Sequence, residues 1–288
     1  MSNPIKSLIN LDLKALSEPI SKLIESISSA IGVLYEPTRI IRKAKAEAKA
    51  NLIRAEGEYN LQSLEHRIAK RINDQEIRRQ ENIENIVTES IKFLPEEVSE
   101  TPVDEDWIFQ FVNKSQDIGN EELQIIWAAI LAKEVEEPYS ISLQTLNTLQ
   151  ILNQSDAKLF NELNNYIWDF EDGCAYLMNK EINSYINSKN IKYKDFLHLE
   201  SLGLINMTSE TQVILSPPAT TMAYGDQFFS FETKNPVFIR ARVLTKSGFE
   251  ISRICEKNID TNYRNLLFQD LNKRGINIVE LRKPPLSE

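Results

Sequence analysis

Between Pro37 and Pro95 the chain runs for 57 residues without a proline and with a single glycine, Gly57. The segment is rich in Ala, Glu, Lys, Arg and Gln, which all have high helix propensity. An unbroken helix of this length would extend about 80–85 Å at 1.5 Å per residue. A chain of 288 residues cannot cover such a helix with its own core. We therefore predict one very long helix, or two helices joined near Gly57, that serves as an assembly element between chains.

The first turns of this segment carry the most basic patch of the chain. It consists of Arg39, Arg42, Lys43, Lys45 and Lys49. A patch of this kind either binds an anionic group, such as phosphate or a lipid headgroup, or forms a solvated face that pairs with acidic residues of another chain. The second interpretation is our prediction, and the first stays as its alternative.

Upstream, residues 17–34 show the apolar spacing of an amphipathic helix. The apolar face consists of Ile20, Leu23, Ile24, Ile27, Ile31 and Leu34. This stripe either packs on protein or inserts into a membrane surface. We predict packing, because the opposite face is rich in serine rather than in the Lys and Arg that anionic lipids attract.

The net charge of −9 is unevenly distributed along the chain. Residues 93–160 contain thirteen acidic and three basic residues, whereas residues 38–92 contain nine acidic and twelve basic residues. An acidic surface repels a nucleic-acid backbone and attracts basic protein surface. We expect the acidic segment of one chain to dock on the basic segment of a neighbour.

The acidic segment also shows the pattern of a small helical bundle. Asp104 and Asn120 are suited to cap helices, and the helices that follow carry Trp107 and Trp127 at positions typical of a core. Two further amphipathic stretches follow, and the second carries Leu159, Phe160, Leu163 and Ile167. We predict four short helices that pack on one another, with the tryptophans as core residues rather than as a ligand site.

From Asn190 onward the pattern is mixed. It predicts a helix over 193–202, strands over 212–215, 227–232 and 237–244, and a final helix and strand over 263–272 and 276–281. A helix that ends in HLESLGLI, then strands, then RVLTKSGFEI, follows the order of elements in a winged helix.

The helix at the DNA-reading position of such a unit would be residues 192–202. It offers Lys192, Lys194 and His198, but also Asp195 and Glu200, and it has no Arg, Asn or Gln to read base edges. We therefore predict that this unit binds protein or has a structural role, and we keep DNA binding as the alternative.

The residue types that carry catalysis or bind metals do not form a recognisable pattern. Cys174 and Cys255 lie far apart, and His66 and His198 lack neighbours at metal-ligand spacing. The chain contains no phosphate-binding glycine loop and no hydrolase or kinase motif. We predict no catalytic residue, no cofactor and no metal. No signal peptide or membrane span is indicated, so we expect a cytoplasmic protein and leave open a peripheral membrane location.

Several stretches resemble the bacterial Abi-alpha, or abortive-infection alpha, family, namely NEELQIIWAAILAKEV, ISLQTLNTLQILNQSDAKLF, FLHLESLGLI and RVLTKSGFEI. The N-terminal half, with LYEPTRIIRKAKAEAKANLIRAEGE, resembles the uncharacterised bacterial domain-of-unknown-function family 2806. The resemblance implies a cytoplasmic bacterial protein of phage defence or of a similar mobile-element context, without established catalytic residues.

We thus predict a mainly α protein of the α+β class in four parts. These are an amphipathic N-terminal helix (1–36), a long charged helix (37–95), an acidic helical bundle (96–170) and a winged-helix-like domain with a C-terminal helix and strand (171–288). The predicted function is that of a non-enzymatic, homo-oligomeric scaffold or sensor subunit in phage defence. Its partners would be copies of itself and a second protein of the same operon or a phage component. The alternatives are a winged-helix DNA-binding regulator and a membrane-acting effector.

Overall fold

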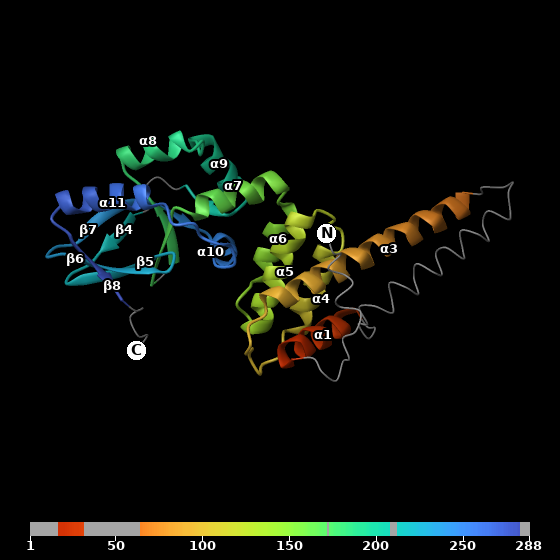
Figure 1. The fold of residues 1–288 in the computed structure, drawn as a ribbon. Coiled ribbons are helices and arrows are strands. Elements are labelled where there is room, and N and C mark those ends of the chain that lie inside the picture. Colours follow the sequence, from red (N-terminus) through yellow and green to blue (C-terminus); the bar gives the residue numbers. More distant parts are fainter. Residues whose placement is uncertain (1–16, 32–63, 172, 208–211, 283–288) are drawn as a thin grey trace, which may run out of the picture. The chain divides into compact units, whose positions relative to one another are not determined.

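The computed structural model describes residues 17–31, 64–171, 173–207 and 212–282 (Figure 1). The chain divides into two compact units, residues 1–150 and 151–288. Helices make up the described part of the first unit, and the second contains an eight-stranded antiparallel sheet with helices. The predicted class, mainly α with a β component, is confirmed.

The first unit is built from helices whose starts the sequence marks clearly. Asp104 accepts a hydrogen bond from the Trp107 amide and Asn120 accepts one from the Leu123 amide, so both predicted caps are confirmed. The elements are α1 (Glu18–Ile31), α3 (Leu64–Ser90), the 3-10 helix η4 (Ile91–Phe93), α4 (Glu105–Ser115), α5 (Glu121–Glu136) and α6 (Leu143–Ile151).

Helix α5 forms the centre of this unit. Its residues from Trp127 to Ala132 are all buried, and α1, α3 and η4 pack against it. Trp107 stacks on Phe111 at 5.3 Å between ring centroids, and Phe111 meets the edge of Trp127 at 5.4 Å. Trp107 also donates a hydrogen bond from its indole nitrogen to the carbonyl of Ile141 (2.7 Å). Both tryptophans therefore have the predicted core role.

A buried carboxylate fixes the turn after α5. Glu134 is fully buried and accepts hydrogen bonds from the amides of Tyr139 (2.6 Å) and Ile141 (2.8 Å). Tyr139 has a positive φ of 70°, a conformation that costs free energy in a residue other than glycine. Two backbone donors aimed at one carboxylate offset this cost, because hydrogen bonds to a charged acceptor are strong.

The second unit begins with a helix that the sequence analysis had placed in the acidic bundle. Helix α7 (Gln154–Asn164) belongs to residues 151–288 and packs against α9 (Tyr193–Ser201). The predicted continuation of α7 to Ile167 is wrong, since Ile167 begins strand β1. Its aliphatic side chain is buried in the sheet rather than on a helix face.

The sheet is much larger than the strands predicted from sequence. Its order is β3-β7-β2-β1-β5-β6-β8, and β4 also pairs with β7. The strands are β1 (Ile167–Phe170), β2 (Gly173–Leu177), β3 (Ile205–Asn206), β4 (Gln212–Leu215), β5 (Ala219–Tyr224), β6 (Gln227–Glu232), β7 (Val237–Leu244) and β8 (Asn277–Leu281). The predicted strands at β4, β6, β7 and β8 are confirmed, and β1, β2, β3 and β5 were missed.

An aromatic core joins this sheet to α11 (Thr261–Lys273), which lies along it in Figure 1. Trp168 of β1 is fully buried and stacks on Tyr224 of β5 at 4.8 Å. Phe268 of α11 packs edge-on against Phe229 of β6 at 5.1 Å. Each large aromatic side chain buried in this way stabilises the unit by roughly 25 cal/mol per Å² of apolar surface removed from water.

The remaining helices of this unit are α8 (Lys180–Ser188) and α10 (Lys246–Ser252). Helix α10 starts at a close backbone approach: a Cβ atom on Gly248 would lie 1.9 Å from the carbonyl oxygen of Leu204. Thr245 caps this helix by accepting a hydrogen bond from the Gly248 amide, and its own amide donates to the same Leu204 carbonyl (3.1 Å). The LGLI and TKSG sequences therefore fit together, and only glycine can occupy position 248 without moving the backbone.

Candidate interaction surfaces

The apolar stripe of α1 is packed within the first unit. Leu23 and Ile27 are fully buried, Ile24 is buried and Ile20 is half-buried. The helix packs against α4 and α5. Lys22 on its polar side donates a hydrogen bond to the carbonyl of Ser99 (2.9 Å). The structure thus places these side chains in a protein contact.

The rest of the predicted apolar stripe and the whole basic patch lie outside the residues that the structure describes. The side chain of Ile31 and all of Leu34 lie outside the described residues. The candidate anionic-ligand patch, Arg39, Arg42, Lys43, Lys45 and Lys49, also lies outside them, as does Gly57.

Helix α3 has two halves of different character. In its first half Leu64, Ile68 and Ile72 repeat every four residues, and 65%, 40% and 51% of their surfaces are exposed. In its second half Ile83, Ile86 and Val87 are buried, and the helix packs against α5. A four-residue repeat aligns side chains on one face of a helix. The first half therefore presents an exposed aliphatic row, Leu64, Ile68 and Ile72, which we call the α3 row.

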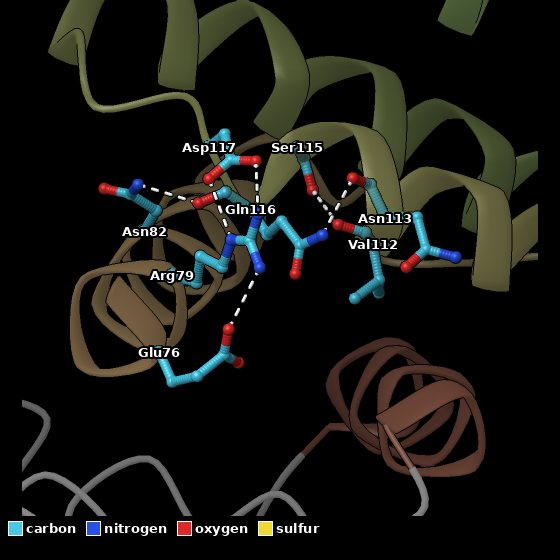
Figure 2. A network of polar contacts seen from close by, with 8 residues as sticks. All are labelled: Glu76, Arg79, Asn82, Val112, Asn113, Ser115, Gln116 and Asp117. Atoms are coloured by element: carbon cyan, nitrogen blue, oxygen red, sulfur yellow. Dashed lines mark hydrogen bonds and ion pairs between the residues drawn. The ribbon is translucent and has the colours of Figure 1, made fainter. Parts of the chain in front are cut away.

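A polar network holds the middle of α3 to the end of α4 (Figure 2). Arg79 donates two parallel hydrogen bonds to the carboxylate of Asp117, at 2.9 and 3.0 Å, and a third to Glu76 (2.9 Å). One turn farther along α3, Asn82 donates to the carbonyl of Gln116 (2.8 Å). The paired geometry orients Arg79 more strictly than a single ion pair would. The network therefore fixes the orientation of α3 relative to the end of α4.

The same network continues into the core through an amide. Gln124 of α5 is buried and donates to the side-chain oxygen of Asn82 (3.2 Å) and to the carbonyl of Ile118 (2.8 Å). The hydrogen bonds from Arg79 lower the pKa of Asp117, while its partial burial acts in the opposite direction. The carboxylate is therefore ionised throughout the neutral range. Arg79 and Asp117 are 38 residues apart in the chain, so no local spacing in the sequence predicts this pair.

In the second unit, α9 presents a mixed surface. Tyr193 and Leu197, one turn apart, are 64% and 42% exposed, and Lys192 and Lys194 are exposed as well. His198 is half-exposed and lies 2.7 Å from the buried carboxylate of Asp156 in α7. Exposed aromatic and aliphatic side chains beside cations are typical of protein-binding surfaces.

Two acidic residues that argued against DNA binding have local structural roles. Asp195 accepts a hydrogen bond from the amide of Lys192 (2.7 Å) at the start of α9, and Glu200 accepts one from the amide of Met207 (2.9 Å). Both carboxylates are thus engaged with the backbone of their own unit. These contacts leave the numbers of acidic and basic residues in the second unit unchanged.

Among the described residues, the metal-ligating side chains are dispersed and the two cysteines have raised pKa values. Within those residues, no cluster of His, Cys, Asp and Glu could hold a metal ion. Burial raises the pKa of Cys174 to about 12 and that of Cys255 to about 11, so both thiols are protonated at neutral pH and are poor nucleophiles. No helix in this part of the chain is long and apolar enough to cross a membrane.

The chain was compared with protein families, with curated proteins and with solved structures. A family model described as "Protein of unknown function (DUF2806)" matches residues 66–268. No curated protein and no solved structure matches. The match runs from α3 to α11 and confirms the resemblance to family 2806, although it begins after residues 34–58, the stretch quoted for that resemblance. The resemblance to the Abi-alpha family stays a prediction.

The buried stripe of α1 allows a direct test of packing against membrane insertion. Ile27→Asp should lower the free energy of unfolding by about 3–4 kcal/mol, because it places a charge in an apolar contact. Glu25→Ala, at an exposed position of the same helix, should change it little. Urea unfolding with and without liposomes measures both variants. Unchanged stability of Ile27→Asp together with loss of liposome binding would contradict packing.

The ion pair of Arg79 and Asp117 predicts a defined pH dependence. Because the folded pKa of Asp117 lies below its unfolded value of about 3.9, the pair stabilises the fold fully above that pH and loses its effect as the pH falls through the folded pKa. Asp117→Asn should therefore destabilise the protein at neutral pH, and the difference from wild type should shrink only below about pH 4. Urea unfolding across this range checks it, with exposed Glu97→Gln as the control. A difference independent of pH down to acid unfolding would show that the charge of Asp117 does not matter.

Proposed function

The chain belongs to the DUF2806 family of proteins of unknown function, and we propose that it is a non-enzymatic subunit that assembles with copies of itself through the α3 row. In this proposal the protein is a homo-oligomeric scaffold or sensor, and α3 is its assembly element. The observation that carries the proposal is the contrast between the two halves of α3.

The α3 row has the properties of an unfilled helix–helix contact. Three large aliphatic side chains on one helix face expose apolar surface that a second helix would remove from water. The helix is already fixed at its other end by buried Ile86 and Val87 and by the Arg79 network. Association therefore costs less conformational entropy than it would for a segment that orders only on binding. Charged residues near the apolar positions would keep the single subunit soluble and form the polar rim of the contact; they are Arg67, Lys70, Arg71 and Asp74.

The exposed residues Lys192, Tyr193, Lys194 and Leu197 form what we call the α9 surface, and we propose that it binds a second partner. Tyr193 and Leu197 offer an exposed apolar pair beside Lys194, which suits a protein surface with acidic residues at its edge. In the phage-defence context that the Abi-alpha resemblance suggests, this partner would be a second protein of the same operon or a phage component. Assembly through α3 would then place several α9 surfaces in one oligomer, so that contacts that are weak singly would together bind the partner stably.

A DNA-binding regulator is the second candidate, because the sequence of the second unit predicts the element order of a winged helix. Strands β2, β7 and β3 are neighbours, and α8 and α9 lie between β2 and β3 in sequence. Helix α9 would then take the reading position. Its exposed face offers Lys192, Lys194 and His198 but also the apolar Tyr193 and Leu197, which favours protein over a phosphate backbone. A membrane-acting effector receives less support, since the described part of the α1 stripe is packed.

The assembly proposal predicts that the purified protein is larger than its monomer mass of 33.2 kDa. Ile68→Glu and Ile72→Glu should each dissociate it, because they place a charge in the proposed contact. The thermal stability of each subunit should stay close to wild type, since both positions are exposed in the single chain. Sedimentation velocity at micromolar concentration measures the change.

Asn73→Glu is the matched control for this experiment. Asn73 is exposed on the same helix but lies beside Ile72 rather than one turn away, so it points to a different face. The control should sediment like the wild type. A wild-type protein that sediments as a single species near 33.2 kDa would remove the basis of the proposal.

For the second candidate we expect only weak, sequence-independent binding of duplex DNA at physiological salt. Gel-shift titration against genomic fragments tests this, with Lys194→Glu as the variant that should weaken any contact to phosphate. Selective nanomolar binding of one fragment, lost in Lys194→Glu, would favour the regulator over the scaffold.

A further inference from the structure

A cavity of about 120 Å³ lies between helices α8 and α9 and the sheet of the second unit. Its apolar lining comes from Tyr176, Met178, Ile186, Ile191, Phe196 and Met207. Tyr193, the exposed aromatic residue of α9, also lines it. A cavity of this size is comparable to one of about 150 Å³ that holds benzene in another protein. The cavity as a whole can therefore take about one aromatic ring.

The polar part of the lining consists of Asn183, Asn187 and Arg242. Asn183 and Asn187 are one turn apart on α8, so both amides lie on one helix face. The hydroxyl of Tyr176 donates a hydrogen bond to the side-chain oxygen of Asn183 (3.1 Å), which orients that amide. The NH₂ group of Asn183 is then the end that can donate to a ligand.

Arg242 brings positive charge to the same cavity. It lies directly opposite Tyr176 in the pairing of β7 with β2, so the two side chains share one face of the sheet. Burial raises the pKa of Tyr176, and the charge of Arg242 opposes this rise. A guanidinium has five N–H donors, enough to bind a carboxylate beside any contact within the protein.

We propose that this cavity is a binding site for a small aromatic carboxylate, with the ring against Phe196, Ile186 and the two methionines and the carboxylate toward Arg242. The proposal goes beyond assembly through α3 and does not depend on it. A ligand here would contact α8, α9 and β7 together, and would stabilise the surface that Tyr193 and Leu197 present to a partner. It would thereby couple a small molecule to partner binding, as a sensor requires.

The methionines give a site-specific test in the full-length protein. Met178 and Met207 line the cavity, whereas Met222 is buried in β5 and does not line it. Methyl NMR of protein labelled at the methionine methyl groups can therefore report on the cavity and on an internal control together. Benzoate is titrated to about 10 mM, a concentration that detects dissociation constants in the millimolar range. The methyl resonances of Met178 and Met207 should shift and reach saturation, while the resonance of Met222 should stay in place.

Three variants and two further probes complete the test. Asn187→Trp should fill the entrance and abolish the shifts, whereas Ser184→Trp, exposed on the same helix and outside the lining, should not. Arg242→Gln should lower the affinity for benzoate about tenfold and leave the affinity for the neutral isostere benzamide unchanged. N-acetylphenylalaninamide represents an aromatic side chain of a protein partner.

Each possible result either overturns or establishes the proposed site. Absence of saturable shifts with benzoate, or equal shifts at Met222, would overturn the site. Equal affinity for benzoate and benzamide would overturn the anionic ligand. Tighter binding of N-acetylphenylalaninamide than of benzoate would show that the cavity accepts a partner's side chain instead. Selective benzoate shifts that depend on Arg242 and disappear in Asn187→Trp would establish the proposed site.

Discussion

The burial of Ile83, Ile86 and Val87 is the contact on which the proposed assembly of this protein depends. Each large aliphatic side chain that leaves water contributes roughly 1.5–3 kcal/mol, so these three side chains anchor the second half of α3 against α5. Helix formation is cooperative, so an anchored segment supports the turns that continue from it. The exposed α3 row is therefore held in helical form, ready for a second surface, by contacts made elsewhere in the same helix.

Polar groups then give these apolar contacts a unique geometry. The two hydrogen bonds from Arg79 to Asp117 and the hydrogen bond from Gln124 to Asn82 join α3, α4 and α5 at one level of the unit. In the second unit Asp156 has a similar role, since it contacts His198 and accepts a hydrogen bond from the amide of Asn153, the N-cap of α7. Apolar packing alone tolerates small shifts and rotations, whereas paired donors and acceptors do not.

The surfaces of the two units differ in a way that suits different partners. The α3 row is aliphatic and repeats at helical spacing, which is typical of contacts between helices. The α9 surface combines an aromatic side chain, an aliphatic side chain and lysines beside a cavity with an arginine in its lining. Such a surface can recognise a different protein or a small ligand by its shape and charge. In the proposed function, self-assembly and the recognition of a ligand or partner therefore fall to separate parts of the chain.

The sequence by itself determined the local elements: the caps at Asp104 and Asn120, the core tryptophans, helix α9 and strands β4, β6, β7 and β8. Capping, helical periodicity and alternation act between residues close in the chain, so they can be read directly. Only the tertiary structure decided that Ile167 begins a strand, that Asp117 pairs with Arg79, and that Tyr176 and Arg242 line one cavity. Those outcomes depend on long-range strand pairing and helix packing, which place residues together without leaving any local periodicity in the sequence.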